Sequence, residues 1–338
     1  MRVFRGLVVF ALFLSVAAAL GACGGGGGGE ESTVSAAASP QELAEFAGFH
    51  GVESGELEVA LEIDRYKKPR PEEINMRILG SFMGAGEENP PPLDMAIESR
   101  GDLGGRSVDF LSGPLWLPGK LVLNFDGKVY EPPEGTFEEL KSKLEDAQDE
   151  EGAGNAGACL EAAGDFNVTG ILRNVTLEGK GETLDGEPIK MVTADLDLPA
   201  AIDELIEMSE EPACSAQLEA VGLPPATQLE ELKKQLKHSV LSAPVTLGVD
   251  KNGVVRYLKV LVNVELRHEE ELEVELVVRL NKVNEVTELA EAHGYSPFPA
   301  LLKQFGLTSE DVEQADGNEI VIGMLEVLSD RLFGRETG

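Results

Sequence analysis

The sequence predicts an α+β protein that contains a large antiparallel sheet with one apolar face. Apolar residues alternate with mostly acidic ones over residues 57–63 and 271–280, which is the period-two pattern of a half-buried strand. Asp-Gly or Asn-Gly steps at 126–127, 185–186 and 252–253 separate extended stretches, as in hairpins. Segments with helical periodicity lie between and after the strands. Because an apolar sheet face must be covered, we expect these helices to pack on it.

The first section is expected to be a helix followed by a meander. Ser39 suits the N-cap position, Pro40 the first turn, and Glu42 completes a capping box, so a helix is expected from Pro40 to about Ala47. Glycines at 48 and 51 then interrupt it. The strands expected next are 57–63, 76–82, 93–99, 107–111, 121–125 and 128–130.

The middle section is expected to contain helices on either side of a hairpin. Residues 136–147 and 159–163 are expected to be helical, and residues 170–198 to be extended around the Asp-Gly turn at 185–186. Helices are then expected at 199–208, 214–220 and 227–236. Asp195 and Asp197 lie between a strand and a helix, which favours helix capping over metal binding.

The third section contains the longest strands. Strands are expected at 238–249, 254–267 and 271–280, with Pro244 marking a bulge or an edge position. Residues 250–253 resemble the start of a calcium loop, but position twelve is Leu261 instead of the required Glu, so a hairpin turn is favoured. Helices are expected at 286–293, 299–305, 309–315 and 319–333.

The N-terminus resembles a bacterial lipoprotein signal peptide. Arg2 and Arg5 precede an apolar run over residues 7–20, which is too short to span a membrane. The sequence Leu20-Gly21-Ala22-Cys23 then resembles a lipobox, and six glycines follow it. This resemblance implies cleavage before Cys23 and lipidation of its sulfur; an ordinary secretory signal with a fortuitous Cys is the alternative.

The remaining cysteines are Cys159 and Cys214. Outside the cytoplasm an even pair favours a disulfide, which would stabilise the fold by about 3–4 kcal/mol. A metal site is the alternative, although neither cysteine has a second Cys or His at ligand spacing.

The charge balance excludes some partners. The chain has 28 Lys and Arg against 61 Asp and Glu, a net charge of −33. No basic stripe is present for nucleic acid, and the sign is wrong for anionic headgroups. No nucleophile–base arrangement stands out, so we expect neither an enzyme nor a cofactor or metal site.

Three turn-centred stretches resemble one family. They are Phe125 to Tyr130 (FDGKVY), Leu184 to Ile189 (LDGEPI) with Thr193 to Ala200 (TADLDLPA), and Val249 to Arg256 (VDKNGVVR). With the lipobox, the chain resembles the LppX/LprG-type lipoproteins of actinobacteria, which belong with the LolA-like lipoprotein carriers. The resemblance implies a half-open β-barrel, a curved antiparallel sheet with helices on its concave face, and a lipid or lipoglycan ligand carried between them.

The residues themselves are consistent with such a cavity, because helices packed loosely over a wide apolar sheet can leave space for a ligand. The expected protein is an extracytoplasmic, lipid-anchored monomer that carries a hydrophobic ligand; an interaction or regulatory module on the same fold is the alternative. The expected parts are a signal peptide (1–22), a tether (23–38), a β domain (39–284) and a helical extension (285–338) on or beside it. The candidate ligand-binding residues are Leu57, Val59, Leu61, Ile63, Leu272, Val274, Leu276, Val278 and Leu280.

Overall fold

The computed structural model describes twelve stretches of the chain. They are residues 39–46, 52–66, 72–83, 93–103, 106–117, 120–125, 127–132, 168–210, 226–236, 239–266, 270–289 and 294–304. The signal peptide, the tether, all three cysteines and the helices predicted at 136–147, 159–163, 214–220, 309–315 and 319–333 lie outside these stretches.

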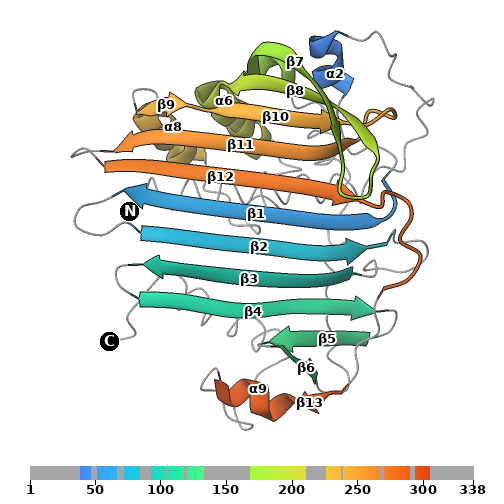
Figure 1. Cartoon of the computed structure of the whole chain (residues 1–338). Helices are drawn as coiled ribbons and strands as arrows, with labels where there is room; N and C mark the ends of the chain where they lie inside the picture. The colour runs from blue at the N-terminus through green and yellow to red at the C-terminus, as the bar shows by residue number, and fades with distance from the viewer. Residues whose placement is uncertain are drawn as a thin grey trace.

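The described strands form one open antiparallel sheet, so the predicted α+β class is confirmed (Figure 1). The order is β13-β6-β5-β4-β3-β2-β1-β12-β11-β10-β8-β7, with β9 beside β11. Among the described strands, only the short β13–β6 pair is parallel. The strands are β1 Gly55–Tyr66, β2 Glu72–Phe82, β3 Leu93–Leu103, β4 Arg106–Leu117, β5 Lys120–Phe125, β6 Lys128–Glu131, β7 Leu172–Glu182, β8 Pro188–Leu196, β9 Val240–Ser242, β10 Pro244–Val249, β11 Val255–Leu266, β12 Glu270–Asn281 and β13 Ser296–Pro297.

The meander from β1 to β6 and the three-strand run from β10 to β12 both follow the prediction. Sequence patterns could not predict the pairing of β1 with β12. These two strands are distant in the chain and lie side by side at the centre of the sheet. This pairing joins the two alternating segments, so that their apolar residues share one face of the sheet.

The described helices are α2 Pro40–Phe46, α5 Val168–Ile171, α6 Leu198–Glu210, α8 Ala226–Leu236 and α9 Phe298–Gln304. The capping box of α2 is confirmed, because the Ser39 N–H donates to Glu42 Oε2 at 2.6 Å and the Glu42 N–H to Ser39 Oγ at 3.2 Å. These bonds hold the pKa of Glu42 below its usual value. In Figure 1, α6 and α8 lie behind the sheet, on the side of β10 to β12.

Three predictions need correction. The strand expected at 238–249 is interrupted at Ala243, because Pro244 has no N–H to continue a ladder and starts a new strand that pairs with both β8 and β11. The helix expected from residue 286 is absent over 286–289, which have no regular structure. The extended segment expected from residue 170 begins with the last residues of the short helix α5.

Candidate ligand-binding site

The nine predicted residues form one continuous apolar strip on β1 and β12. The antiparallel register places eight of them in four pairs across the two strands. The ninth, Leu272, lies two residues before Val274 on β12 and is opposite Arg65. The aligned pairs are Leu57–Leu280, Val59–Val278, Leu61–Leu276 and Ile63–Val274.

This strip is buried. Eight of its nine residues are at most 3% exposed, and Leu57 is partly buried. All but Leu57 and Leu280 belong to the main hydrophobic core cluster; Leu280 packs in a smaller cluster with Val52, Phe82 and Val254, and Leu57 packs against both clusters. The strip therefore lies on the inner face of the sheet.

Helices α6 and α8 contribute apolar side chains to the same core. Buried residues of α6 recur at helical spacing, which gives the helix one apolar stripe. In α8, Leu229, Leu232 and Leu236 are buried in the core cluster. Lys233 of α8 forms an ion pair with Asp203 of α6. The buried stripe of α6 is Leu198, Ala201, Ile202, Leu205 and Met208.

Asp197 caps α6, as the sequence predicted. Its Oδ1 accepts the Ala200 N–H at 3.1 Å, and its Oδ2 accepts two bonds from the Arg173 guanidinium. Burial acts to raise the pKa of Asp197, but these hydrogen bonds outweigh it and the pKa lies below its usual value. Asp195 instead accepts a bond from the Asn174 amide at 2.8 Å.

The outer face of the same strands is charged. Glu58 of β1 lies between two arginines: Arg77 of β2 contacts its Oε1 at 2.8 Å, and Arg279 of β12 its Oε2 at 3.2 Å. Lys259 of β11 pairs with Glu275 of β12 at 2.9 Å. These cross-strand pairs explain why the sheet tolerates many ionisable residues on one face.

Carboxylates face one another at one end of this outer face. Asp64 of β1 is registered opposite Glu73 of β2 on one side and Glu273 of β12 on the other. Burial, and then the charge of Glu73, raise the pKa of Asp64. The charges of Asp64 and Glu273 are the main causes that raise the pKa of Tyr66.

The β7–β8 hairpin folds over the outer face, and its tip reaches the end of β12 (Figure 1). Buried Arg256 of β11 holds it there. Its Nη2 contacts Asp185 Oδ2 at 2.8 Å and its Nη1 contacts Asp250 Oδ2 at 3.3 Å, while its Nε donates to the Leu280 carbonyl at 2.8 Å. Asp185 Oδ2 also accepts the Lys282 N–H at 2.6 Å.

The groups around Asp185 at the tip of the hairpin lower its pKa. Burial acts to raise its pKa, but hydrogen bonds from the Thr183 hydroxyl and the Lys282 N–H, together with the Arg256 charge, lower it below its usual value. Both turns joined by Arg256 were predicted as turns. Gly186 has φ +86°, a conformation that glycine adopts readily, and Asp250 Oδ1 accepts the N–H groups of Asn252 and Val254.

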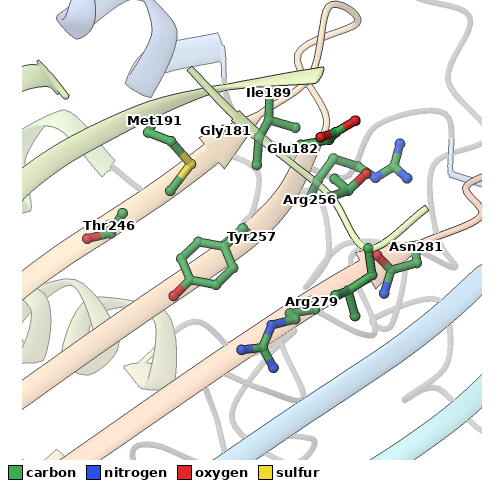
Figure 2. A pocket seen from close by; sticks show the side chains of 11 residues that line it. Gly181, Glu182, Ile189, Met191, Thr246, Arg256, Tyr257, Arg279 and Asn281 are labelled. Carbon is green, nitrogen blue, oxygen red and sulfur yellow. The ribbon is translucent and has the colours of Figure 1, made fainter. Parts of the chain in front are cut away.

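A pocket of about 270 Å³ lies between this hairpin and the outer face (Figure 2). Ile189 and Met191 extend from the hairpin, and Tyr257 and Arg279 from the strands beneath it. Sequence reasoning missed this site, because it located the hairpin turn and gave no sign that the hairpin crosses the sheet. The lining residues are Gly181, Glu182, Thr183, Leu184, Ile189, Met191, Thr246, Arg256, Tyr257, Arg279 and Asn281.

Within the described stretches, no group of three or more His, Cys, Asp or Glu residues could hold a metal ion. No helix among them has the length and apolar character needed to cross a membrane. The lipidation site at Cys23 and the Cys159–Cys214 pair lie outside the described residues and stay predictions.

Among known proteins, the chain is similar to solved structures. No protein-family model and no curated protein sequence matches the chain. Among solved structures, the chain is similar to the crystal structure of LprF from Mycobacterium bovis, over 75% of this chain and 97% of that chain. The TM-score is 0.32 and the sequence identity is 11%.

Proposed function

We propose that this chain is a lipoprotein of the cell envelope that carries a lipid or another hydrophobic ligand without catalysing a reaction. The ligand would bind between the apolar strip on β1 and β12 and the helices that pack on the same face. In this proposal the acylated Cys23 anchors the chain outside the cytoplasm, and residues 23–38 tether the β domain to the membrane.

The observation that carries the proposal is the continuity of the apolar strip. Four cross-strand pairs align on one face of two central strands, while the opposite face carries ion pairs. A ligand placed against such a strip gains about 25 cal/mol for each Å² of apolar surface removed from water. The lipobox and the three turn-centred stretches support the same class of protein.

Residues 285–338 are proposed to pack on or beside the β domain. In support, β13 of this segment pairs with β6 of the sheet through Ser296–Tyr130 and Pro297–Glu131. Immediately before the segment, the side chain of Asn284, the last residue of the β domain, accepts the Glu53 N–H at 2.7 Å.

The proposal is tested by expressing the full-length chain with its own signal in a bacterial host and identifying lipids in organic extracts of the purified protein. A defined lipid is expected at a near-constant ratio to protein. In the variant Cys23→Ser, the protein is expected to leave the membrane fraction because its acylation site is gone.

Two neighbouring substitutions provide a matched pair. Leu61 points to the inner face and Ala60 to the outer face of the same strand. Leu61→Phe adds bulk to the strip at a cost of about 1–3 kcal/mol and is expected to lower the lipid content severalfold. Ala60→Phe is expected to leave it unchanged. Equal lipid content in both variants, with folding verified by circular dichroism, would exclude this site.

The alternative is an interaction module that uses the same fold without a lipid. The facing carboxylates of Asp64, Glu73 and Glu273 favour it, because a cationic partner would relieve their repulsion. A well-folded protein that yields no lipid, and that retains one defined cationic partner in a pull-down, would support this alternative.

A further inference from the structure

We propose that the pocket beneath the β7–β8 hairpin binds a neutral, hydroxyl-rich ring of the size of one sugar residue. The pocket lies on the outer face of the sheet, opposite the apolar strip. Binding at this pocket is therefore independent of the proposed carrier function and can be tested separately from it.

The walls of the pocket are fixed by the fold. The tip of the hairpin is held by Arg256, which is 6% exposed and contacts Asp185 of the hairpin and Asp250 of the neighbouring turn. Beneath the hairpin, a Cβ added at Gly248 would lie 2.7 Å from Ile189 Cδ1 and 2.9 Å from Tyr257 Cβ. Only glycine permits this close packing, so the pocket is preorganised by its supporting contacts.

Three polar groups in the pocket lack partners. Within the described part of the chain, neither the Asn281 amide nor the hydroxyls of Thr246 and Tyr257 form a hydrogen bond. Asn281 is only 8% exposed and its side chain lines the pocket. The amide of Asn281 is reached through the pocket, and a ligand with several hydroxyls can both donate to and accept from these groups.

The charges favour a neutral ligand. The two guanidinium groups in the lining repel a cation, and both contact carboxylates: Arg256 contacts Asp185 and Asp250, and Arg279 contacts Glu58, which it shares with Arg77. The remaining lining charge is the carboxylate of Glu182. This carboxylate and the net charge of −33 of the chain both oppose the binding of an anion.

The size and the apolar surfaces also suit a sugar ring. The volume of about 270 Å³ lies just below the range of about 300–1,000 Å³ for larger ligands. The side chains of Ile189 and Met191 and the ring of Tyr257 supply apolar surface for the C–H groups of the ring. Arg279, whose guanidinium carbon lies 5.8 Å from the centre of the Tyr257 ring, adds hydrogen-bond donors beside that surface.

The test uses the full-length protein and saturation-transfer NMR with methyl glycosides of glucose, mannose and galactose. Glucuronate and glucosamine serve as charged probes. At least one neutral glycoside is expected to bind more tightly than either charged probe. Asn281→Leu and Tyr257→Phe are each expected to weaken that binding about tenfold, a loss typical of an unmade buried hydrogen bond.

Tyr295→Phe is the matched control, because this exposed tyrosine lies outside the pocket and contacts Lys120. Its affinity is expected to equal that of the wild type. Because Tyr257→Phe keeps the ring, it preserves the packing if Asn281→Leu disturbs the fold. Absence of binding by every neutral glycoside, binding that survives both pocket substitutions, or equal binding of the charged probes would overturn the inference. Lipid content, measured on the same samples, reports separately on the carrier function.

Discussion

Arg256 joins three separate parts of the chain. It holds the tip of the β7–β8 hairpin through Asp185, the 250–253 turn through Asp250, and the end of β12 through the Leu280 carbonyl. Arg256 and Asp250 are only 6% and 4% exposed. Each charge is therefore stabilised by the opposite charge of the other residue and not by hydration.

Arg256→Gln is expected to destabilise the protein by about 3–5 kcal/mol, because it leaves a buried carboxylate uncompensated. The measurement is urea denaturation at pH 7. Lys251→Ala is the control: Lys251 forms an exposed pair with Glu187 at 3.2 Å, and its loss should cost less than about 1 kcal/mol. Similar losses in the two variants would contradict the role assigned to Arg256.

Substitution of Asp64 is expected to stabilise the protein, in contrast to substitution of Arg256. Its raised pKa means that the folded state holds its proton more tightly than the unfolded state, so its charge destabilises the fold at pH values above that pKa. Asp64→Asn is therefore expected to add about 0.5 kcal/mol at pH 7, and the gain should vanish as the pH falls below about 4.

The measurement for Asp64→Asn is denaturation at several pH values. Asp203→Asn removes a carboxylate that pairs with Lys233 and is expected to give no gain. A loss of stability at pH 7 in Asp64→Asn would show that the facing carboxylates do not repel in the folded protein.

At the scale of elements, the sequence predicted most of the regular structure in the described residues. Alternation located β1 and β12, and the Asp-Gly step located the β7–β8 turn, because both are local signals. The break between β9 and β10 depends on a long-range contact as well as on Pro244: the Ala243 carbonyl accepts the Leu196 N–H of β8 at 2.7 Å. A single long-range contact of this kind produces no periodic pattern in the sequence.

The same reason explains why the outer pocket was missed. The hairpin crosses the sheet because Asp185 meets Arg256, a residue 71 positions away. Each residue alone resembles an ordinary turn or strand residue. The inner strip was found because its signal is periodic, whereas the pocket depends on single pairings between distant segments.

Gly248 is where the hairpin and the sheet pack most closely. Gly248→Ala is expected to destabilise the protein by about 1–3 kcal/mol, because the new Cβ would overlap Ile189 and Tyr257. Thermal unfolding followed by circular dichroism provides the measurement. Gly294→Ala is a useful comparison, since no atom lies within 4 Å of its added Cβ and any cost there comes from its φ of +78° alone. An unchanged Gly248→Ala protein would contradict the close packing.

At the scale of the whole molecule, the open sheet separates two environments. Its inner face carries the apolar strip and the helices α6 and α8, and its outer face carries ion pairs, facing carboxylates and the hairpin pocket. This division allows an apolar ligand and a polar one to bind without competing for the same residues. The central claim concerns the inner face, where we propose that a lipid binds.

Native mass spectrometry of the purified full-length protein, before and after extraction with organic solvent and refolding, tests that claim most directly. We expect a population that is heavier than the bare acylated chain by the mass of one lipid. This added mass should be lost on extraction and restored when that lipid is added back. A folded protein whose mass never exceeds that of the acylated chain, with or without added lipid, would contradict it.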